Sequence, residues 1–515
     1  MPAWVVGARE SAERDRAAIE RGTPSRVLME RAGTAAAHEI TRRYPEQLKR
    51  GVVVVTGSGN NGGDGWVVAG TLARGGVDVT VVETAPATAD KSPDAIAMKA
   101  AAIDAVHTVD VIASRPGIVV DAIVGTGFSG EPRGHVVSGM ETIDHLRAAG
   151  ATVVALDVPS GLDATTGHEV RCAVADLTLS FGGIKRGTLL ARDCCGEIVA
   201  LDIGLEREEG SGKREAETLP LLVDGEWVRS RVPPIRYDAH KGTKKHLAIV
   251  GGGKGMPGSV VLAARGALRS GIGLARILTD EANVSAVLAA VPSALISDWP
   301  NSKEAIDADV SNWADAIIIG PGLGKSAPAR KLIEQVLQAS RKPVILDADA
   351  LNLFDGAADS LGVLLDGRAA LITPHPAEFA RLVGTDVRTV LANVFDIGLD
   401  LARSLRATVL LKGSPTVIFT PNGERYVVAR GTAALGTGGS GDLLDGIAGT
   451  ILAQTGDALT AGACAAWIHG RAAELCEYVR GTTLEDVVYA LPRAWNELEP
   501  APDPPVIAEL PRAAE

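Results

Sequence analysis

The sequence feature that most constrains the fold is a repeated alternation of short valine-rich runs with segments of helical periodicity. The apolar runs in the first part of the chain are VVVVT (52–56), VDVTVV (77–82), IVVDAIVG (118–125), TVVALDVP (152–159) and LTLSF (177–181). An amphipathic helix is predicted over residues 25–43, ahead of the first run. Apolar strands separated by helices predict a parallel sheet that is covered on both faces.

The same alternation restarts in the second part of the chain. The predicted strands there are 246–251, 316–320, 343–349, 369–375 and 408–413, and two alanine-rich helices follow at 442–455 and 457–479. The segment 206–217 (EREEGSGKREAE) is charged and lacks apolar periodicity, which is typical of a linker. A chain of 515 residues is also too long for one ordinary core. We therefore predict two α/β domains, 1–217 and 218–515.

Composition and charge exclude several classes of function. The formal net charge is −12 and the basic residues are scattered among acidic ones, which argues against nucleic-acid binding. The N-terminus lacks the long apolar core of a secretory signal, and no apolar run reaches the ~18 residues of a membrane helix. The sequence therefore predicts a cytoplasmic protein without a membrane or nucleic-acid partner.

The five cysteines do not follow a metal-binding spacing. They are Cys172, Cys194, Cys195, Cys464 and Cys476. An odd number without zinc-site spacing indicates buried or free thiols in a reducing compartment.

A glycine-rich loop follows the first valine-rich run. Gly57, Gly59 and Gly62 form a G-x-G-x-x-G pattern, and Glu83 ends the next strand, where a ribose-binding acid would lie in a dehydrogenase. The pattern recurs at 253–258 and 436–441, so one copy carries little weight. The side chains of the 60–64 segment (NNGGD) argue against a pyrophosphate site, since an aspartate repels phosphate. Two amides and a carboxylate are better suited to a polar ligand or a hard cation.

Two further loops place an aspartate near the carboxyl end of a predicted strand. They are DAIVGTGFSGE (121–131), which begins with Asp121, and ALDVPSGLDATTG (155–167), which contains Asp157. Either aspartate alone is a common turn residue. Ligands of open α/β sheets bind at this edge, so the three loops together predict a site.

These three motifs together resemble the NAD(P)H-hydrate epimerase family over most of residues 1–205. The resemblance implies an N-terminal Rossmann-like three-layer α/β/α domain that interconverts the R and S hydrates of NADH or NADPH at C6. The residues implied to bind this substrate are Asp157 together with Asn60, Asn61, Gly62, Gly63, Asp64, Gly125, Thr126, Gly127, Phe128, Ser129, Gly130 and Glu131. Asn61, Asp121 and Ser160 are implied to hold a potassium ion. One carboxylate can move the proton that this epimerisation needs, so Asp157 is the candidate acid and base.

The stretch GTGGSGDLLDGIAG (436–449) is the most informative motif of the second half. Its glycines lead into a predicted helix whose first turn carries Asp442. Backbone N–H groups at a helix start stabilise anions, and a carboxylate just beyond them can accept a hydroxyl proton during phosphoryl transfer. Asp442 could equally be an ordinary helix-start carboxylate.

Six motifs, GGGKGMPGS, GPGLG, LDADALN, TPHPAEF, KGSPT and GGSGD, resemble the ADP/ATP-dependent NAD(P)H-hydrate dehydratases, a ribokinase-like family, over about 240–480. The resemblance implies that Asp442 is the catalytic base and that Ser259, Gly322 and His375 contact the hydrated nicotinamide cofactor. Nucleotide-binding residues are implied to be Lys412, Gly413, Ser414, Pro415, Thr416 and Gly441. Glu378 is a candidate magnesium ligand. We expect ADP as phosphoryl donor, with AMP and phosphate released, and a homo-oligomeric assembly.

The sequence departs from this second family at two places. Ser259 stands where alanine is usual, and Thr243 begins a Thr-Lys-Lys segment in place of an acidic-aromatic-glycine run. Three other functions stay open at this point: an NAD-dependent oxidoreductase, a ribokinase-like small-molecule kinase, and a nucleotide sensor without catalysis.

Overall fold

The computed structural model describes residues 3–88, 92–109, 115–205, 219–496, 498 and 502–513. Backbone contacts divide the chain into two compact units, one within Met1–Glu215 and Ala501–Ala513, the other mainly within Ala216–Pro500. The predicted linker, 206–217, lies outside the described residues. No helix among the described residues is long and apolar enough to span a bilayer.

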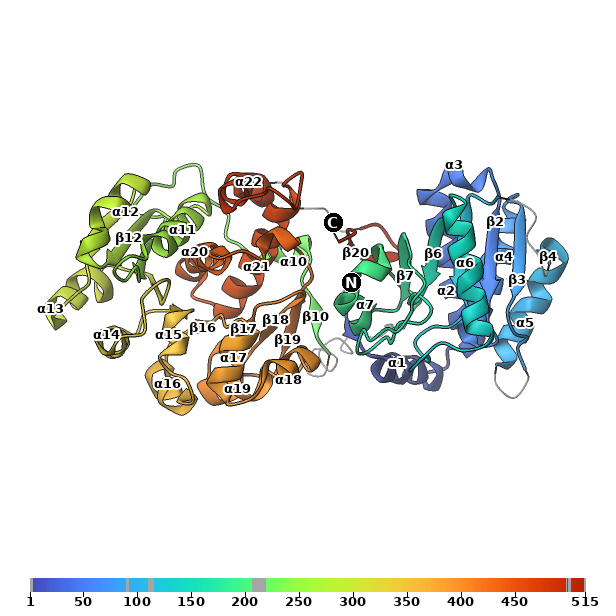
Figure 1. Ribbon diagram of the computed structural model, residues 1–515, viewed down its shortest axis with the longest axis horizontal. Helices are drawn as coiled ribbons and strands as arrows, with labels where there is room; N and C mark the ends of the chain where they lie inside the picture. The colour runs from blue at the N-terminus through green and yellow to red at the C-terminus, as the bar shows by residue number, and fades with distance from the viewer. Residues whose placement is uncertain are drawn as a thin grey trace. The chain divides into compact units, whose positions relative to one another are not determined.

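The first unit is built on an eight-stranded sheet in the order β20-β9-β7-β6-β5-β2-β3-β4 (Figure 1). All neighbours are parallel except β20 and β9. The strands of this unit are β1 Val5–Val6, β2 Val52–Thr56, β3 Val79–Glu83, β4 His107–Thr108, β5 Ile118–Ala122, β6 Thr152–Leu156, β7 Leu177–Phe181, β8 Ile184–Lys185, β9 Glu197–Leu201 and β20 Val506–Leu510. Strands β1 and β8 form a separate parallel pair.

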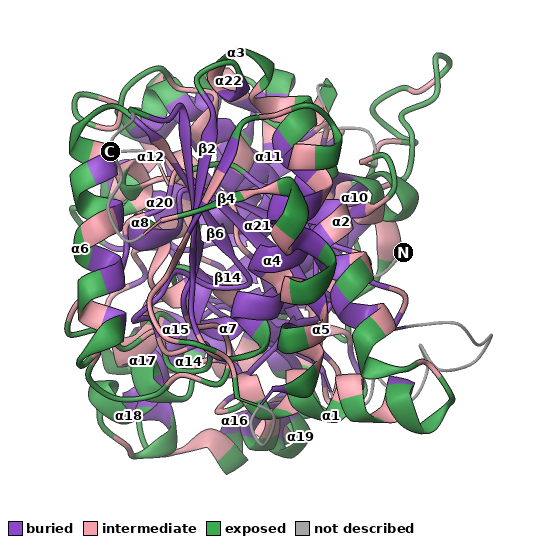
Figure 2. Cartoon of the chain, turned by 90° about the vertical axis from the view of Figure 1, so that its right-hand side faces the viewer, coloured by how far each residue is buried: buried purple, intermediate pink, exposed green. Residues whose placement is uncertain are grey.

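Helices cover both faces of this sheet, as the alternation in the sequence predicts. Helices α2, α4 and α5 pack over one face and α6 over the other. The helices are α1 Ala8–Glu20, α2 Ser25–Arg43, α3 Pro45–Leu48, α4 Asn60–Arg74, α5 Pro93–Ala102, α6 His135–Ala148, α7 Arg186–Leu190 and α8 Arg192–Cys195, with a 3-10 turn at Ile103–Ala105. The central strands β2, β5 and β7 are buried, the edge strand β4 is exposed, and the outward helix faces are exposed (Figure 2).

One strand of this sheet comes from the far end of the chain. Strand β20, Val506–Leu510, pairs antiparallel with β9, so it belongs to the first unit and not to the second, where the sequence placed it. The apolar Val506, Ala508 and Leu510 are buried there. A five-residue strand carries no signal for which sheet it will join, so local pattern alone gives no basis for this pairing.

The second unit is built on a ten-stranded sheet in the order β10-β19-β18-β17-β16-β15-β14-β11-β12-β13. The strands are β10 Leu221–Leu222, β11 His246–Val250, β12 Leu274–Thr279, β13 Leu295–Asp298, β14 Ala316–Ile319, β15 Val344–Leu346, β16 Ala370–Ile372, β17 Thr408–Leu411, β18 Thr416–Phe419 and β19 Arg425–Val428. Strand β18 runs antiparallel to both of its neighbours, β17 and β19. The prediction of a parallel sheet did not include this reversal. The Asn422–Gly423 turn between β18 and β19 is the sequence signal for that hairpin.

Helices again form two layers around this sheet. Helices α11, α20 and α21 share the large apolar core on one face, and α14, α16 and α19 lie on the other (Figure 1). The helices are α10 Gly225–Arg231, α11 Pro257–Arg269, α12 Val284–Ala290, α13 Lys303–Ile306, α14 Ala327–Ala339, α15 Asp349–Asn352, α16 Ala358–Leu365, α17 Pro376–Val383, α18 Val387–Ala392, α19 Leu399–Leu405, α20 Ser440–Thr455, α21 Ala458–Glu474 and α22 Leu484–Asn496. Short helical turns span Glu281–Asn283, Asp307–Ser311 and Ala433–Leu435.

The first G-x-G-x-x-G pattern has a packing explanation. A Cβ atom on Gly57 would lie 2.0 Å from the carbonyl oxygen of Ile123, and one on Gly62 would lie 2.0 Å from that of Gly57. Backbone therefore meets backbone at both positions. A Cβ on Gly59 would meet nothing within 4 Å. The outer two glycines are needed to bring β2, β5 and α4 together, whatever ligand the loop binds.

Alanine substitutions in this loop should separate packing from ligand binding. Gly62→Ala should lower the free energy of unfolding of the first unit by about 3 kcal/mol or more, because the Gly57 carbonyl cannot move without disturbing β2. Gly59→Ala, the matched control, should cost no more than about 1 kcal/mol. Calorimetric unfolding of the two variants tests this; equal shifts would contradict the packing explanation.

Candidate active sites

The polar loops of the first unit gather where the direction of the sheet reverses. From β2 the chain continues to β3 on one side, whereas from β5 it continues to β6 and β7 on the other. The carboxyl ends of β2 and β5 are therefore the switch point at which open α/β sheets bind ligands. The loops after β2, β5, β6 and β7 all end at this edge.

Three of the predicted residues meet at this edge. The Ser160 hydroxyl donates to Oδ1 of Asp121 at 2.6 Å, and the Ser160 backbone N–H donates to Oδ2 at 2.8 Å. Asn61 is buried, its amide has no hydrogen-bond partner among the described residues, and its Cγ would lie 3.2 Å from a Cβ on Gly125. Burial raises the pKa of Asp121 to about 6. An amide oxygen without a partner beside a buried carboxylate fits a cation that is bound by oxygen ligands.

Asp157 lies after β6 in a conformation that few residues adopt. Its φ is +67°, in the left-handed region. The carboxylate accepts a hydrogen bond from the Phe181 backbone N–H at 3.2 Å and forms an ion pair with Lys185 Nζ at 2.5 Å. Lys185 is 1% exposed and also donates to the Phe181 carbonyl oxygen at 2.7 Å. A strained backbone that holds a paired carboxylate at a sheet edge is typical of a functional residue.

Lys185 was missed by the sequence reasoning. It follows β7 by four residues, whereas the quoted motifs end at β6. A lysine after an apolar strand end is usually a solvated residue, so its sequence position gave little signal. Its burial next to Asp157 becomes visible only when β7 is placed beside β6.

Further carboxylates surround the Asp157–Lys185 pair. Burial, and then the charge of Asp157, raise the pKa of Asp64 well above the usual range for an aspartate. The pKa of Asp15 is raised chiefly by burial. One buried lysine thus lies near three carboxyl groups, and burial disfavours the ionised form of two of them, Asp64 and Asp15.

The other predicted contacts of this unit divide into packed and exposed positions. Asn60 is exposed and its Oδ1 accepts from Ser92 Oγ at 2.9 Å, while Gly62 and Gly63 are buried in the first turn of α4. The 125–131 loop is half-buried or exposed, so its backbone is open to a ligand. Glu83 is paired with Lys99 Nζ at 2.7 Å. Glu83, the acid that the oxidoreductase alternative assigns to ribose, therefore already has a charged partner.

The second unit repeats the arrangement at its own switch point. From β11 the chain continues to β12 and β13, while β14, β15, β16 and β17 extend the sheet on the other side. The loops after β11 and β14 are joined by backbone hydrogen bonds from Gly252 to Pro321 (2.8 Å) and from Gly253 to Gly322 (2.6 Å). GGGKGMPGS and GPGLG thus meet at the edge where a ligand is expected.

Asp442 lies at this edge in the first turn of α20, next to Ser259 and close to a buried ion pair. Burial raises the pKa of its carboxyl to about 6, against the lowering effect of a hydrogen bond from Ser259. The Ser259 hydroxyl also lies 2.9 Å from the position of a Cβ on Gly322. The structure therefore brings together three residues that the sequence assigned to the dehydratase substrate.

Lys412 is the cation of this site, and buried carboxylates hold it. Its Nζ lies 2.8 Å from Oδ1 of Asp347 and 3.9 Å from Glu378. A Cβ on Gly441 would lie 3.1 Å from that Nζ. Burial and Asp347 raise the pKa of Asp445 well above its usual range. The sequence reasoning missed Asp347 and Asp445 as site residues. Asp347 lies within the quoted motif LDADALN, and Asp445 follows the motif GGSGD by three residues.

The 412–416 loop, which the sequence assigned to the nucleotide, and the His375–Glu378 pair also lie at this edge. Gly413 and Ser414 are exposed, Pro415 is buried, and Thr416 donates to the Gly413 carbonyl oxygen at 3.0 Å. His375 caps α17: its Nδ1 accepts from the N–H of Ala377, and its own N–H donates to Oε2 of Glu378 at 2.9 Å. Burial lowers the pKa of His375. The Glu378 carboxylate thus accepts the His375 N–H and lies near Lys412. It stays a candidate magnesium ligand that would act through a water molecule.

Comparisons with known proteins agree with both halves. Residues 247–493 match the family model described as NAD(P)H-hydrate dehydratase, and residues 25–187 match the YjeF-related protein N-terminus. The bifunctional NAD(P)H-hydrate repair enzyme Nnr of Escherichia coli is 32% identical over 91% of this chain and 89% of its own length. That of Coxiella burnetii is 34% identical over 90% and 93%. The chain belongs to the bifunctional NAD(P)H-hydrate repair enzymes.

A solved structure also matches the second half. The ADP/ATP-dependent NAD(P)H-hydrate dehydratase of Bacillus subtilis, co-crystallised with ATP and Mg2+, is 31% identical, with a TM-score of 0.48, over 55% of this chain and 99% of its own. Family membership confirms the fold class predicted for each half, an α/β/α epimerase-type unit followed by a ribokinase-like unit, and the two-enzyme organisation.

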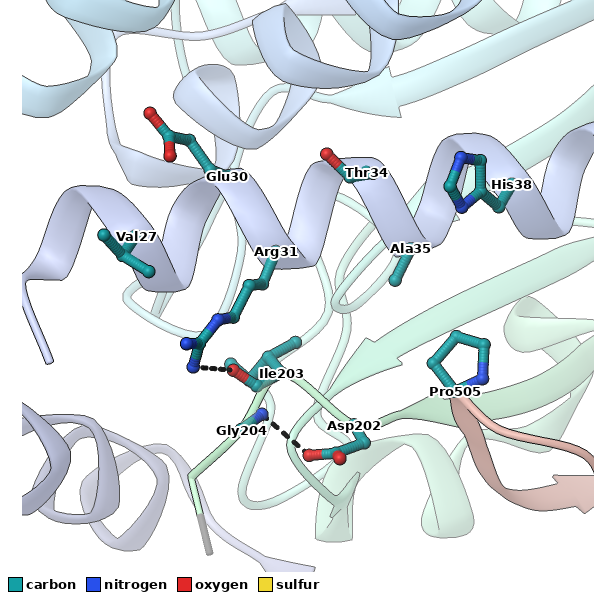
Figure 3. A pocket seen from close by; sticks show the side chains of 10 residues that line it. All are labelled: Val27, Glu30, Arg31, Thr34, Ala35, His38, Asp202, Ile203, Gly204 and Pro505. Carbon is teal, nitrogen blue, oxygen red and sulfur yellow. Dashed lines mark hydrogen bonds between the residues drawn. The ribbon is translucent and has the colours of Figure 1, made fainter. Parts of the chain in front are cut away.

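A hollow of about 490 Å3 in the first unit is separate from these residues (Figure 3). It lies between α2 and the segments after β9 and before β20, and its lining includes Arg31, His38 and Asp202. Arg31 donates to the Ile203 carbonyl oxygen at 3.4 Å, and Asp202 accepts from the Gly204 N–H. None of the predicted site residues lines it, so we assign it no part in the proposed catalysis.

Proposed function

We propose that this chain repairs hydrated NADH and NADPH in two steps. The first unit interconverts the R and S hydrates at C6, and the second converts the S hydrate to NAD(P)H with ADP, releasing AMP and phosphate. The proposal rests on the family membership together with one observation. Each unit places a candidate acid–base carboxylate at the switch point of its own sheet: Asp157, which is buried, and Asp442, which is half-buried.

The proposed epimerisation uses the amine-like nitrogen beside the hydrated carbon. A proton given to the C6 hydroxyl lets water leave while N1 supplies an electron pair, and water returns to the other face with loss of a proton. Asp157 is the group that accepts and returns this proton. Lys185 is a positioning residue: its buried ammonium neutralises the carboxylate and fixes its direction. Asn60, Asp64 and the 125–131 loop would surround the substrate.

A potassium ion fits the Asn61, Asp121 and Ser160 cluster. The fit rests on the buried Asn61 amide without a partner and on the desolvated Asp121 carboxylate, since a cation would compensate both. When bound, the ion would supply positive charge beside the substrate loop. The chain's own residues keep that loop in place through the hydrogen bonds between Ser160 and Asp121.

The proposed dehydration replaces hydroxide, a poor leaving group, by phosphate. Asp442 accepts the C6 hydroxyl proton as the oxygen attacks the terminal phosphorus of ADP, and the bond to the AMP oxygen breaks. Phosphate then leaves C6 and a proton leaves C5, which restores the ring double bond. Gly441 and the start of α20 would stabilise phosphate oxygens. Magnesium, held through Glu378, would neutralise nucleotide charge, with the 412–416 loop beside the phosphates.

Recovery of reduced-nicotinamide absorbance tests the proposed function. The purified chain is incubated with both hydrate epimers, Mg2+ and K+, with ADP, with ATP or without nucleotide, and AMP and phosphate are measured. We expect recovery only with nucleotide, with one AMP per NAD(P)H when ADP is supplied. Absence of recovery with either nucleotide would overturn the proposal.

The pH dependence of dehydration should follow Asp442. A base with a pKa of about 6 is ionised above that pH, so kcat/KM should fall as pH decreases through about 6. Ser259→Ala removes the hydrogen bond that lowers this pKa, so the acidic limb should move to higher pH. The pH profiles of the two proteins are compared; a limb that does not move would contradict the role given to Ser259.

Self-association remains part of the proposal. We expect a homo-oligomer, as the family resemblance implies, and light scattering of the purified chain measures it directly. A monomer at all concentrations would remove this expectation and leave both active sites untouched.

A further inference from the structure

A cluster outside both active sites has the donor set of a transition-metal site. One ligand atom each of Glu169, Cys172 and Cys194 lies within 4.8 Å of the other two. Glu169 and Cys172 belong to the segment between β6 and β7, and Cys194 belongs to α8. Glu169 is exposed, Cys172 is half-buried and Cys194 is 5% exposed. The fold thus brings together three residues that have no metal-site spacing in the sequence.

Hydrogen bonds link the three groups. The Cys194 thiol donates to Oε2 of Glu169 at 2.6 Å. A hydrogen bond with the Cys194 thiol, burial, and Glu169 raise the pKa of Cys172 far above the usual value for a thiol. A divalent cation bound by the two sulfurs as thiolates would displace their protons and would offset the charge of the Glu169 carboxylate.

We propose that Glu169, Cys172 and Cys194 form a zinc site, with water as the fourth ligand. Zinc prefers thiolate together with nitrogen or carboxylate oxygen in tetrahedral geometry. Binding releases two thiol protons to solvent: a carboxylate, two thiols and Zn2+ become one carboxylate and two thiolates on the ion. With Zn–S of about 2.3 Å and Zn–O of about 2.0 Å, the ligand atoms stand about 3.5 Å apart. The Glu169 side chain is exposed, so its carboxylate can move away from the Cys194 sulfur until the two atoms are about 3.5 Å apart.

A redox disulfide fits the cluster less well. Thiolate is the species that attacks a disulfide or an oxidant, and a neighbouring carboxylate disfavours it. Glu169 faces both sulfurs, so the cluster is poorly arranged for oxidation. The same carboxylate is a third ligand when a cation is present.

The position of the cluster gives the metal a structural role for the first unit. The Ala173 N–H donates to the Ser160 carbonyl oxygen, and the Ala175 N–H donates to that of Cys194, both at 2.8 Å. A Cβ on Gly161 would lie 2.2 Å from the Arg171 carbonyl oxygen. The segment with Cys172 therefore packs directly on the loop that carries Asp157 and Ser160. A bound ion would tie α8 to that loop.

Cobalt substitution tests the site on the full chain. The protein is reduced, freed of metal with a chelator and titrated with Co2+ without oxygen. We expect a thiolate-to-cobalt charge-transfer band that saturates at one equivalent and disappears when Zn2+ is added. Cys172→Ser and Cys194→Ser should abolish the band, and Glu169→Gln should weaken Co2+ binding at least about tenfold.

Cys476→Ser is the matched control, because Cys476 is half-buried in the second unit. It should keep the band at full amplitude. Calorimetric unfolding of each variant checks that the first unit is folded. Three outcomes would overturn the proposal: no band in the unmodified chain, a band that survives Cys172→Ser, or conversion to a Cys172–Cys194 disulfide in place of Co2+ binding. None of them depends on the proposed reactions.

Discussion

Asp442→Asn should abolish dehydration of the S hydrate, with kcat reduced about 1,000-fold or more. The amide cannot accept the hydroxyl proton at the step in which oxygen attacks phosphorus. Burial raises the pKa of Asp442 to about 6, so the ionised carboxylate is disfavoured by the fold at neutral pH. The neutral amide should therefore leave the melting temperature unchanged or slightly higher. Single-turnover production of NAD(P)H from the S hydrate measures the effect.

The same variant provides its own control through the other active site. Epimerisation by Asp442→Asn should equal that of the unmodified chain, because Asp157 lies in a different unit. Nucleotide affinity should change little, since Lys412 and the 412–416 loop are untouched. A variant that still dehydrates at more than a tenth of the normal rate would show that another group is the base.

Asp157→Asn should reduce epimerisation by about 100- to 10,000-fold. Asparagine tolerates the left-handed backbone at this position, so the substitution keeps φ at +67° without new strain. It removes the proton acceptor and leaves Lys185 Nζ, 2.5 Å away, without its charged partner. NMR measures the rate at which the two hydrate epimers interconvert. The rate with Asp157→Asn is compared with the rate without enzyme.

Lys185→Met separates positioning from acid–base chemistry at this site. The apolar side chain leaves the Asp157 carboxylate intact but without its buried counter-ion. We expect a smaller loss of kcat than in Asp157→Asn, together with a changed pH profile, because the charge of Lys185, which lowers the pKa of Asp64, is lost. An unchanged profile with lower stability alone would assign Lys185 to structure and not to the site.

Local sequence pattern predicted the framework of both units. The valine-rich run at 52–56 is β2, residues 25–43 are α2, and the LTLSF run is β7, because buried parallel strands and amphipathic helices have periodicities that can be read directly. The same pattern placed Asp121, Asp157 and Asp442 at strand or helix ends. Carboxyl ends of parallel strands share one edge, so the proximity of Asp121 and Asp157 within the first unit followed from the fold class.

What the pattern could not predict depends on contacts between distant segments. Lys185 becomes part of a site only because β7 lies beside β6, and Asp347 only because β15 brings it to Lys412. Strand β20 joins the first sheet from the end of the chain. Cys172 and Cys194 are separated in sequence and meet only when the segment after β6 folds against α8. In each case the residue type was visible, but the partner was not.

The most direct test supplies the R hydrate alone, with ADP, Mg2+ and K+, and follows the absorbance of reduced nicotinamide. If both units act on one metabolite, the unmodified chain restores all of the absorbance. Asp157→Asn then proceeds only at the rate of spontaneous epimerisation, and Asp442→Asn restores none. Equal recovery by all three proteins, or no recovery by the unmodified chain, would contradict the account.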